Sequence, residues 1–476
     1  MVANICGRSA GRCLYKILFV NRLKSDVIQQ RKTAYQVHQI SVKIAIRNNK
    51  YAFLLVLNLF LQAVVCKSTM KRRLNLTPLA IIAVIFFALN AYVIAGLGTI
   101  NSSPYLNRVF WVFIIGISLA LFYAIKQLSV RGQNKFFLIV SHAFLIVFVA
   151  ELVFALFLLL GDLYRLIVSI GSNFQAEGYQ LAGRNVYWVD FAFVMFCLTV
   201  ILFIFGITRG KYAYRVIKHT LYFDDLPASF EGFTITQISD VHAGSFTKPK
   251  EVRKGIDLIN AQKSDLFVFT GDLVNNAASE IVPYINQFSQ IKAPFGQFSV
   301  LGNHDYGDYI KWPSEQAKKE NLEQLKAYHQ KLGFRLLLDE HVELRKDGEK
   351  IILAGIENWG IGFGERGDLK KALEHTKVDD FKILLSHDPS HWEAQVKNNP
   401  SKIQLALAGH THGMQFGIEA FGIKWSPVMY RYKHWGGIKT ENGRYLNVNR
   451  GFGFIGFSGR IGIWPEITVI ELKKTL

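Results

Sequence analysis

The sequence has few cysteines and few charged residues for a chain of 476 residues. Its four cysteines all lie in the first 200 residues and form no C-x-x-C pair, which excludes a disulfide framework and a thiolate metal site. Only 19% of the residues are charged and 50% are hydrophobic, whereas a soluble domain carries about 25% charged residues. The composition excludes a disordered or collagen-like chain and indicates that part of the sequence lies in lipid.

Acidic residues are scarce only in the first half of the chain. Residues 1–69 hold eleven Lys or Arg and one acidic residue, and residues 70–220 hold thirteen Lys or Arg and four acidic residues. Residues 221–476 hold 31 of each kind, so the net charge of +19 lies entirely before them. Because nucleic-acid binding needs cations clustered on a folded domain, we expect no nucleic-acid partner.

Residues 70–208 contain the long hydrophobic segments. These are residues 76–98, 109–125, 136–160 and 186–207. Each is about as long as a helix that crosses the bilayer core, so we expect a four-helix transmembrane region in the cell membrane. Ten Lys or Arg residues flank one side of these spans and three flank the other. The positive-inside rule therefore predicts that both ends of the bundle, and everything after residue 208, face the cytoplasm.

Residues 1–69 form a basic extension that does not fit this pattern. The apolar stretch at residues 51–66 contains Asn58 and Gln62, and if it crossed the membrane it would leave ten basic residues outside. We interpret the extension as either a peripheral basic arm or an over-extended reading frame. The second interpretation is favoured, with Met70 as the natural start.

From about residue 219 short apolar strands alternate with helices. Strands are predicted at residues 233–238, 266–269, 298–301, 350–354, 382–385 and 403–407, with further strands at 417–423, 436–439, 445–448 and 467–472. Helices are predicted at residues 248–261 and 314–332. This alternation predicts a layered α/β domain over residues 219–476, with its ligand at the carboxyl ends of the strands.

Five of these strands are followed by side chains that can bind metals. The segments are Ser-Asp240-Val-His242, Thr-Gly-Asp272, Gly-Asn303-His304-Asp305, Ser-His387-Asp388 and Gly-His410-Thr-His412. Imidazole and carboxylate donors without thiolate suit manganese (Mn), iron (Fe) or zinc (Zn) better than calcium. The donors are too many for one ion. Two ions that share one carboxylate would use them all, an arrangement that clamps a phosphoryl group and activates a water.

The order of these motifs resembles the calcineurin-like metallophosphoesterase superfamily across residues 219–476. Ser-Asp-x-His-x-Gly and Gly-His-Thr-His-Gly are most similar to its bacterial membrane-anchored phosphodiesterase-type members. The resemblance implies a four-layer αββα domain that holds two divalent metal ions. One departure is that Met414 stands where many relatives carry glycine, a change that touches no ligand.

The resemblance also implies a role for each residue. The first metal would be held by Asp240, His242 and His412, the second by Asn303, His387 and His410, and both by Asp272. His304 would donate a proton to the leaving oxygen or clamp the phosphate, oriented by Asp305. The chain is then expected to hydrolyse a phosphoester, a diester rather than a monoester, by a metal-activated hydroxide.

Two other functions fit part of the sequence. One is a metal-binding sensor that controls the membrane bundle, and the other is a transporter with an appended hydrolase. Glu151 and Asp190 inside the apolar segments are candidates for transport. No carboxylate relay or inverted repeat accompanies them, so we expect them to form interhelical hydrogen bonds instead. Asn303 and His304, which a sensor could lose, are both present, so we favour catalysis.

The substrate stays open at this stage. A site held close to a bilayer favours a phospholipid or a lipid-linked head group, with cyclic nucleotides and soluble diesters as alternatives. Residues 306–380, which include Trp312 and Trp359, are expected to form much of the pocket rim. Gly451-Phe-Gly453-Phe-Ile-Gly456 matches a dinucleotide fingerprint, but it lies about twenty residues before the end of the sequence, without room for a βαβ unit. We therefore expect no dinucleotide cofactor.

Overall fold

The computed structural model describes residues 77–131, 134–173 and 181–475. Contacts between residues divide the chain into two compact units. The first unit runs up to Tyr123 and includes Glu151–Phe193, and the second includes Ala124–Ala150 and Val194–Leu476. The basic extension discussed above, residues 1–69, lies outside the described residues.

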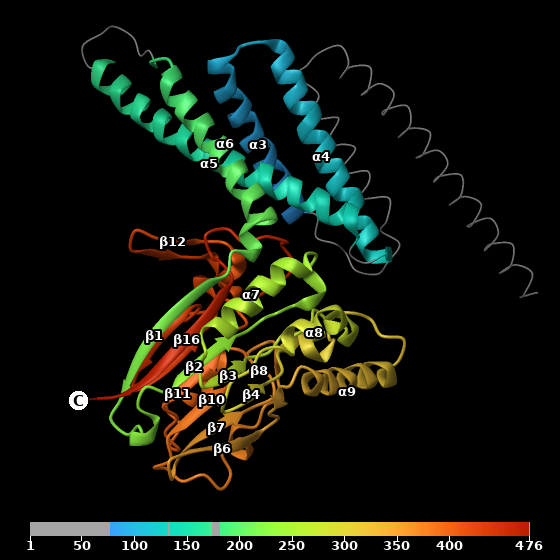
Figure 1. Cartoon of the computed structure of the whole chain (residues 1–476). Helices are drawn as coiled ribbons and strands as arrows, with labels where there is room; N and C mark the ends of the chain where they lie inside the picture. Colours follow the sequence, from blue (N-terminus) through green and yellow to red (C-terminus); the bar gives the residue numbers. More distant parts are fainter. Residues whose placement is uncertain (1–76, 132–133, 174–180, 476) are drawn as a thin grey trace, which may run out of the picture. The chain divides into compact units, whose positions relative to one another are not determined.

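Four long apolar helices come first among the described residues, as the sequence predicts. They are α3 (Thr77–Ile100), α4 (Pro104–Arg131), α5 (Lys135–Asn173) and α6 (Val186–Thr208) (Figure 1). Each contains a stretch long and apolar enough to cross a bilayer. Large apolar side chains such as Ile82, Val112 and Ile201 are exposed on them, as a surface that faces lipid requires. With 39 residues, α5 is about 58 Å long, which exceeds the thickness of a bilayer core, about 30 Å.

The α/β domain contains two six-stranded sheets. The first has the order β1 (Arg215–Phe223), β16 (Glu466–Lys474), β2 (Thr234–Ile238), β3 (Leu266–Phe269), β4 (Gln297–Ser299) and β5 (Arg335–Leu336). The second has the order β14 (Gly437–Glu441), β15 (Arg444–Val448), β11 (Leu405–Ala408), β10 (Lys382–Leu385), β7 (Glu349–Gly355) and β6 (Glu340–Lys346). Strands β2 to β5 are parallel, as are β15, β11, β10 and β7.

Three clusters of buried side chains define four layers. Val268 and Ile383 belong to the cluster between the two sheets. On the other face of the first sheet, Phe269 packs with residues of α7 (Pro249–Ala261), α8 (Ile285–Phe288) and α9 (Glu315–Lys331). On the other face of the second sheet, Leu384 packs with residues of α10 (Leu369–Ala372) and a π-helical turn, Trp392–Val396. The predicted αββα order is confirmed.

Three edge strands and one hairpin differ from the prediction, and β5 was not predicted because it is only two residues long. Strands β1 and β6 were not predicted, because charged residues interrupt their apolar pattern, as is common at sheet edges. The single strand predicted at residues 417–423 is instead a hairpin of β12 (Ile418–Ala420) and β13 (Ile423–Trp425). Gly422, with φ of +77°, reverses the chain there. A second small hairpin pairs β8 (Trp359–Gly360) with β9 (Gly364–Glu365).

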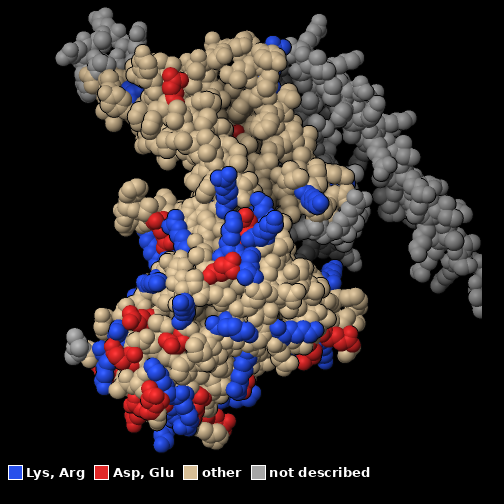
Figure 2. Space-filling model, viewed as in Figure 1, with Lys and Arg blue, Asp and Glu red and all other residues tan. Residues whose placement is uncertain are grey.

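The surface of the α/β domain carries both signs of charge. Figure 2 shows Lys and Arg interspersed with Asp and Glu over this part of the chain, in keeping with the equal numbers of basic and acidic residues after residue 220. The visible surface of the apolar helices carries few charges of either sign.

Candidate metal centre

The seven predicted metal ligands come from loops at the carboxyl ends of five strands. In the first sheet Ile238 of β2 is level with Phe269 of β3, and in the second Leu385 of β10 is level with Leu407 of β11. The loops that follow therefore begin at the same edge of their sheets. Two groups of donor atoms gather there, each within 4.8 Å: Asp240, His242 and His412 in one, and Asp272, His387 and His410 in the other.

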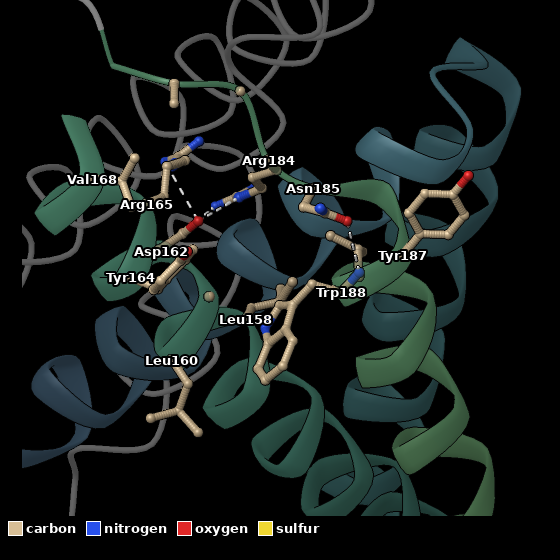
Figure 3. A pocket seen from close by; sticks show the side chains of 14 residues that line it. Leu158, Leu160, Asp162, Tyr164, Arg165, Val168, Arg184, Asn185, Tyr187 and Trp188 are labelled. Carbon is tan, nitrogen blue, oxygen red and sulfur yellow. Dashed lines mark hydrogen bonds and ion pairs between the residues drawn. The ribbon is translucent and has the colours of Figure 1, made fainter. Parts of the chain in front are cut away.

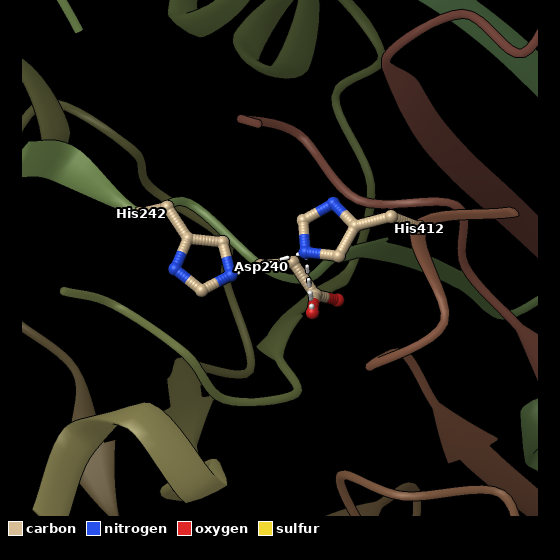
Figure 4. A group of neighbouring side chains, drawn as sticks. All are labelled: Asp240, His242 and His412. Carbon is tan, nitrogen blue, oxygen red and sulfur yellow. Dashed lines mark hydrogen bonds and ion pairs between the residues drawn. The ribbon is translucent and has the colours of Figure 1, made fainter. Parts of the chain in front are cut away.

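The first group is buried and its donors face one another (Figure 4). His412 Nε2 lies 3.2 Å from Asp240 Oδ1 and 3.0 Å from His242 Nε2. His242 Nε2 lies 3.5 Å from Asp272 Oδ2. Two imidazole nitrogens and two carboxylate oxygens that converge out of water need a positive charge among them, and a divalent cation would supply it.

The second group meets the first at Asp272. His387 Nε2 lies 3.2 Å from Asp272 Oδ2, 3.2 Å from Asn303 Oδ1 and 3.2 Å from His410 Nδ1. Asp272 Oδ2 is thus close to one nitrogen of each group. This is the position in which a carboxylate can serve two cations at once.

The outward nitrogens of two of these rings are held by other groups. His387 Nδ1 lies 2.7 Å from the carbonyl oxygen of Thr270, which can only accept, so Nδ1 carries hydrogen. His410 Nε2 lies 3.4 Å from Asp388 Oδ2. Such partners fix the orientation of a ligand ring and leave its inner nitrogen for the metal.

The electrostatics of these side chains agree with this interpretation. Burial alone would lower the pKa of His387, but the Asp272 carboxylate outweighs burial and raises that pKa to about 10. Burial lowers the pKa of His410 to about 4, so the imidazole is uncharged at neutral pH. The lone pair of its inner nitrogen is then available to a metal. The donor set combines a carboxylate with imidazole nitrogens, so the residues present fit divalent metal ions.

Five of the seven candidate ligands have a left-handed backbone. They are Asp240, His242, Asp272, His410 and His412, with φ between 46° and 68°. This conformation costs about 1–2 kcal/mol for a residue with a Cβ atom. Such conformations persist where the surrounding fold imposes them, and they cluster at functional sites. Met414, two residues after His412, also has φ of 54°.

Comparison with known proteins identifies the family. Residues 233–414 match the family model described as calcineurin-like phosphoesterase, and residues 72–211 match one described as the transmembrane domain of a probable calcineurin-like phosphoesterase. Over 264 residues the chain is 30% identical to the uncharacterized metallophosphoesterase YkuE of Bacillus subtilis, covering 54% of this chain and 85% of that protein. The chain belongs to the calcineurin-like metallophosphoesterases.

Other relatives share the same domain. An uncharacterized metallophosphoesterase of Aquifex aeolicus is 28% identical over 55% of this chain and 93% of its own length. A transmembrane protein with a metallophosphoesterase domain from Danio rerio is 27% identical over 58% of this chain and 61% of its own length. The predicted family is confirmed, and the chain is a membrane-associated metallophosphoesterase with candidate metal ligands in place.

The geometry corrects one role in the metallophosphoesterase site. Asp305 does not orient the His304 ring. Its carboxylate instead accepts hydrogen bonds from the backbone N–H groups of Gly302, Asp272, Leu273 and Val274. The His304 ring is held by the carbonyl oxygen of Asn275, 2.8 Å from Nδ1. Asp305 therefore positions the loop that carries Asp272, and the orientation of the His304 ring is set by Asn275.

Sequence reasoning assigned no role to three further polar groups. Asp388 supports His410 and accepts a hydrogen bond from Tyr432 Oη at 3.1 Å. The amide of Asn303 donates to Tyr309 Oη at 2.7 Å. The role of Asp388 could have been predicted from the sequence, because Asp388 directly follows a predicted ligand at the end of a strand. The two tyrosines lie in loops without any motif.

The glycine motif at residues 451–456, which matches a dinucleotide fingerprint, packs against this site. Its first two glycines lie under the loop that carries Asp240. Phe452 N donates to Ser239 O at 2.7 Å, and Gly453 N donates to Asp240 O at 2.8 Å. A Cβ atom at Gly453 would lie 1.9 Å from the carbonyl oxygen of Val241. Glycine is required here for close packing against the metal loop, not for a dinucleotide.

The expected rim is partly formed by different residues. The ring of Tyr309 lies 4.4 Å from that of His304, and the ring of Phe363 lies 4.5 Å from that of His410. Trp359 is buried, and the indole N–H of Trp312 donates to the carbonyl oxygen of Gly307. Tyr309 and Phe363, both within residues 306–380, are therefore aromatic side chains that adjoin the site.

A third group of donors lies apart from the five motif loops. Glu393 of the π-helical turn, His434 and Glu441 of β14 could also hold a cation. Lys397 Nζ already lies 2.6 Å from a Glu393 oxygen and 3.3 Å from a Glu441 oxygen. We assign this group a structural role, because the lysine supplies its positive charge.

Proposed function

We propose that this protein is a membrane-anchored phosphodiesterase that uses two divalent metal ions. The observation that carries the proposal is the convergence of seven donor side chains from two sheets, with Asp272 Oδ2 close to a nitrogen of each group. The first ion is assigned to Asp240, His242 and His412, the second to Asn303, His387 and His410, and Asp272 is shared. Manganese, iron and zinc all suit these donors.

Bound cations of this kind lower the pKa of a water and neutralise charge on phosphoryl oxygens. The protein's own groups complete the chemistry. Asp272 and Asp240 supply the negative charge that holds the cations, and Asp305 fixes the Asp272 loop. His304, with Nδ1 held by Asn275, presents Nε2 as the donor of a proton to the leaving oxygen.

The rim supports a diester substrate. Tyr309 and Phe363 offer apolar ring faces beside His304 and His410, where substituents on phosphorus can rest. Arg431 lies 4.8 Å over the Phe363 ring and adds one positive charge. The single positive charge of Arg431 balances the single negative charge of a phosphodiester. A phosphomonoester carries two negative charges and would be bound better by more than one such side chain. Soluble diesters and phospholipid or lipid-linked head groups share this chemistry.

The substrate preference can be measured on the full chain in detergent, loaded with Mn²⁺. We expect kcat/KM for bis(p-nitrophenyl) phosphate to exceed that for p-nitrophenyl phosphate by about tenfold or more. A higher value for the monoester would contradict the diester proposal. Loss of both activities while two metals stay bound would instead support the sensor alternative.

The proposed orientation rests on charge around the four apolar helices. The sequence places ten basic residues at one set of helix ends and three at the other, so we propose four spans with the catalytic domain in the cytoplasm. A reporter fused after Leu476 that works only in the cytoplasm should be active. Protease added to intact cells should leave residues 219–476 uncut. Cleavage there from outside would overturn the orientation.

A further inference from the structure

A cavity of about 600 Å³ lies within the first unit, between the second half of α5 and the start of α6 (Figure 3). Its lining includes Leu158, Leu160, Asp162, Arg165, Arg184 and Trp188. The metal centre lies entirely in the second unit. The cavity is therefore a separate feature that the proposed hydrolysis does not use.

The polar side of the cavity holds two guanidinium groups and one carboxylate. Arg184 donates to both oxygens of Asp162, with Nε–Oδ1 at 2.9 Å and Nη2–Oδ2 at 2.7 Å. Tyr92 Oη donates to Asp162 Oδ2 at 2.9 Å, and Arg165 Nη2 lies 3.4 Å from Oδ1. Asp162 thus accepts three hydrogen bonds from Arg184 and Tyr92, and Arg165 lies at ion-pair distance from it. The cluster keeps one net positive charge.

Arg165 is the group that this cluster leaves incompletely paired. Among the residues that the structure describes, its buried Nε has no hydrogen-bond partner. A buried guanidinium nitrogen without an acceptor is costly. The rest of the guanidinium is accessible, with 21% of the side chain exposed, and an anionic oxygen in the cavity would bind it there and balance the remaining charge.

The other side of the cavity is apolar and shaped by a glycine. The indole of Trp188 lies against α5 and donates from Nε1 to the carbonyl oxygen of Phe157 at 2.7 Å. A Cβ atom at Gly161 would lie 2.3 Å from Trp188 Cδ1, so only glycine allows this packing. Leu158 and Leu160 also line the wall. Hydrocarbon next to an anionic group fits these surfaces.

The surroundings indicate a membrane–water boundary. Tyr164 and Tyr187 are 71% and 82% exposed next to the cavity, and Tyr and Trp gather at that boundary. Arg184 lies just before the apolar stretch that begins at Val186. The α3–α4 and α5–α6 ends of the helices carry only three basic residues, and two of them, Arg165 and Arg184, line this cavity.

We propose that the cavity binds the head-group phosphate of an anionic phospholipid. The partly exposed guanidinium of Arg165 would donate to a phosphate oxygen, the Asp162–Arg184 pair would hold the site open, and an acyl chain would lie along Leu158, Leu160 and Trp188. Guanidinium groups are suited to phosphate because their donors form a planar fork. A lipid with one net negative charge would neutralise the cluster.

The test uses the full chain in dodecyl maltoside and native mass spectrometry. The probes are dioctanoyl phosphatidylglycerol, dioctanoyl phosphatidylcholine and inorganic phosphate. We expect one phosphatidylglycerol per chain, bound about tenfold or more tightly than phosphatidylcholine. Equal binding of the two lipids would overturn the proposal. If inorganic phosphate bound as tightly as phosphatidylglycerol, the site would bind free phosphate and the proposal of a lipid ligand would be wrong.

Two arginine variants and one glycine variant locate the site. Arg165→Gln should weaken phosphatidylglycerol binding by about tenfold or more, since it removes a charge-assisted donor. Arg108→Gln, which changes an exposed arginine outside the cavity, is the matched control and should stay within about twofold of wild type. Gly161→Leu should also weaken binding, because it displaces Trp188. Wild-type affinity in both Arg165→Gln and Gly161→Leu would refute this location.

Discussion

Replacing Asp272 by asparagine is expected to lower hydrolysis by about a thousandfold or more, or about 4 kcal/mol in activation free energy. Its Oδ2 lies 3.2 Å from His387 Nε2 and 3.5 Å from His242 Nε2, so it faces both donor groups. Loss of a supporting partner alone costs about 10–100-fold. Removal of a shared charge should cost more, and at least one metal should be lost.

The fold should survive this change. Asparagine keeps an oxygen that can accept the hydrogen bond from His304 N, which lies 2.8 Å from Asp272 Oδ1. The measurement is kcat/KM for a nitrophenyl diester together with bound metal per chain. Asp257→Asn, in an exposed ion pair on α7, is the control with the same change in charge. Activity of Asp272→Asn within about tenfold of wild type would rule out the shared-carboxylate assignment.

His304→Ala is expected to keep the metal content and to lower turnover by about a hundredfold or more. The ring lies beside the candidate ligands, with its Nδ1 held by Asn275 O, so it can act on substrate without ligating metal. If Nε2 supplies a proton, the loss should be smaller for nitrophenolate, which leaves without a proton, than for an alkoxide.

A series of diesters with leaving groups of different pKa measures this difference. His375→Ala is the control, because that side chain is 88% exposed. An equal loss for nitrophenyl and alkyl leaving groups would show that His304 clamps the phosphate and is not an acid. Loss of metal in His304→Ala would show that the ring supports coordination instead.

The convergence of the candidate ligands could be predicted from the sequence because their chemistry and position agree. Imidazole and carboxylate side chains directly follow apolar strands, and parallel strands place such residues at one edge of a sheet. The structure brings all seven together. Their ring orientations could not be predicted, because the partners of His387 and His304 are the backbone carbonyl groups of Thr270 and Asn275. Every residue has a backbone carbonyl group, so the sequence does not indicate which of them will accept a hydrogen bond from a histidine ring.

The extent of the helices was harder to predict than their existence. The apolar segment at residues 136–160 ends at Gly161 and Asp162, yet α5 continues to Asn173. Backbone hydrogen bonds extend a helix regardless of side-chain polarity, so a polar residue ends an apolar run without ending the helix. The added turns carry Asp162 and Arg165. The cavity next to α6 could therefore not be predicted from the sequence and is found only in the structure.

The most direct test of the central proposal is metal reconstitution of the full chain. Metal-depleted protein would receive Mn²⁺ in steps, with bound metal and hydrolysis of bis(p-nitrophenyl) phosphate measured at each step. The seven converging ligands predict that activity is absent without metal and reaches its plateau at about two ions per chain. A plateau at one ion, or full activity in the metal-depleted protein, would contradict a binuclear phosphodiesterase.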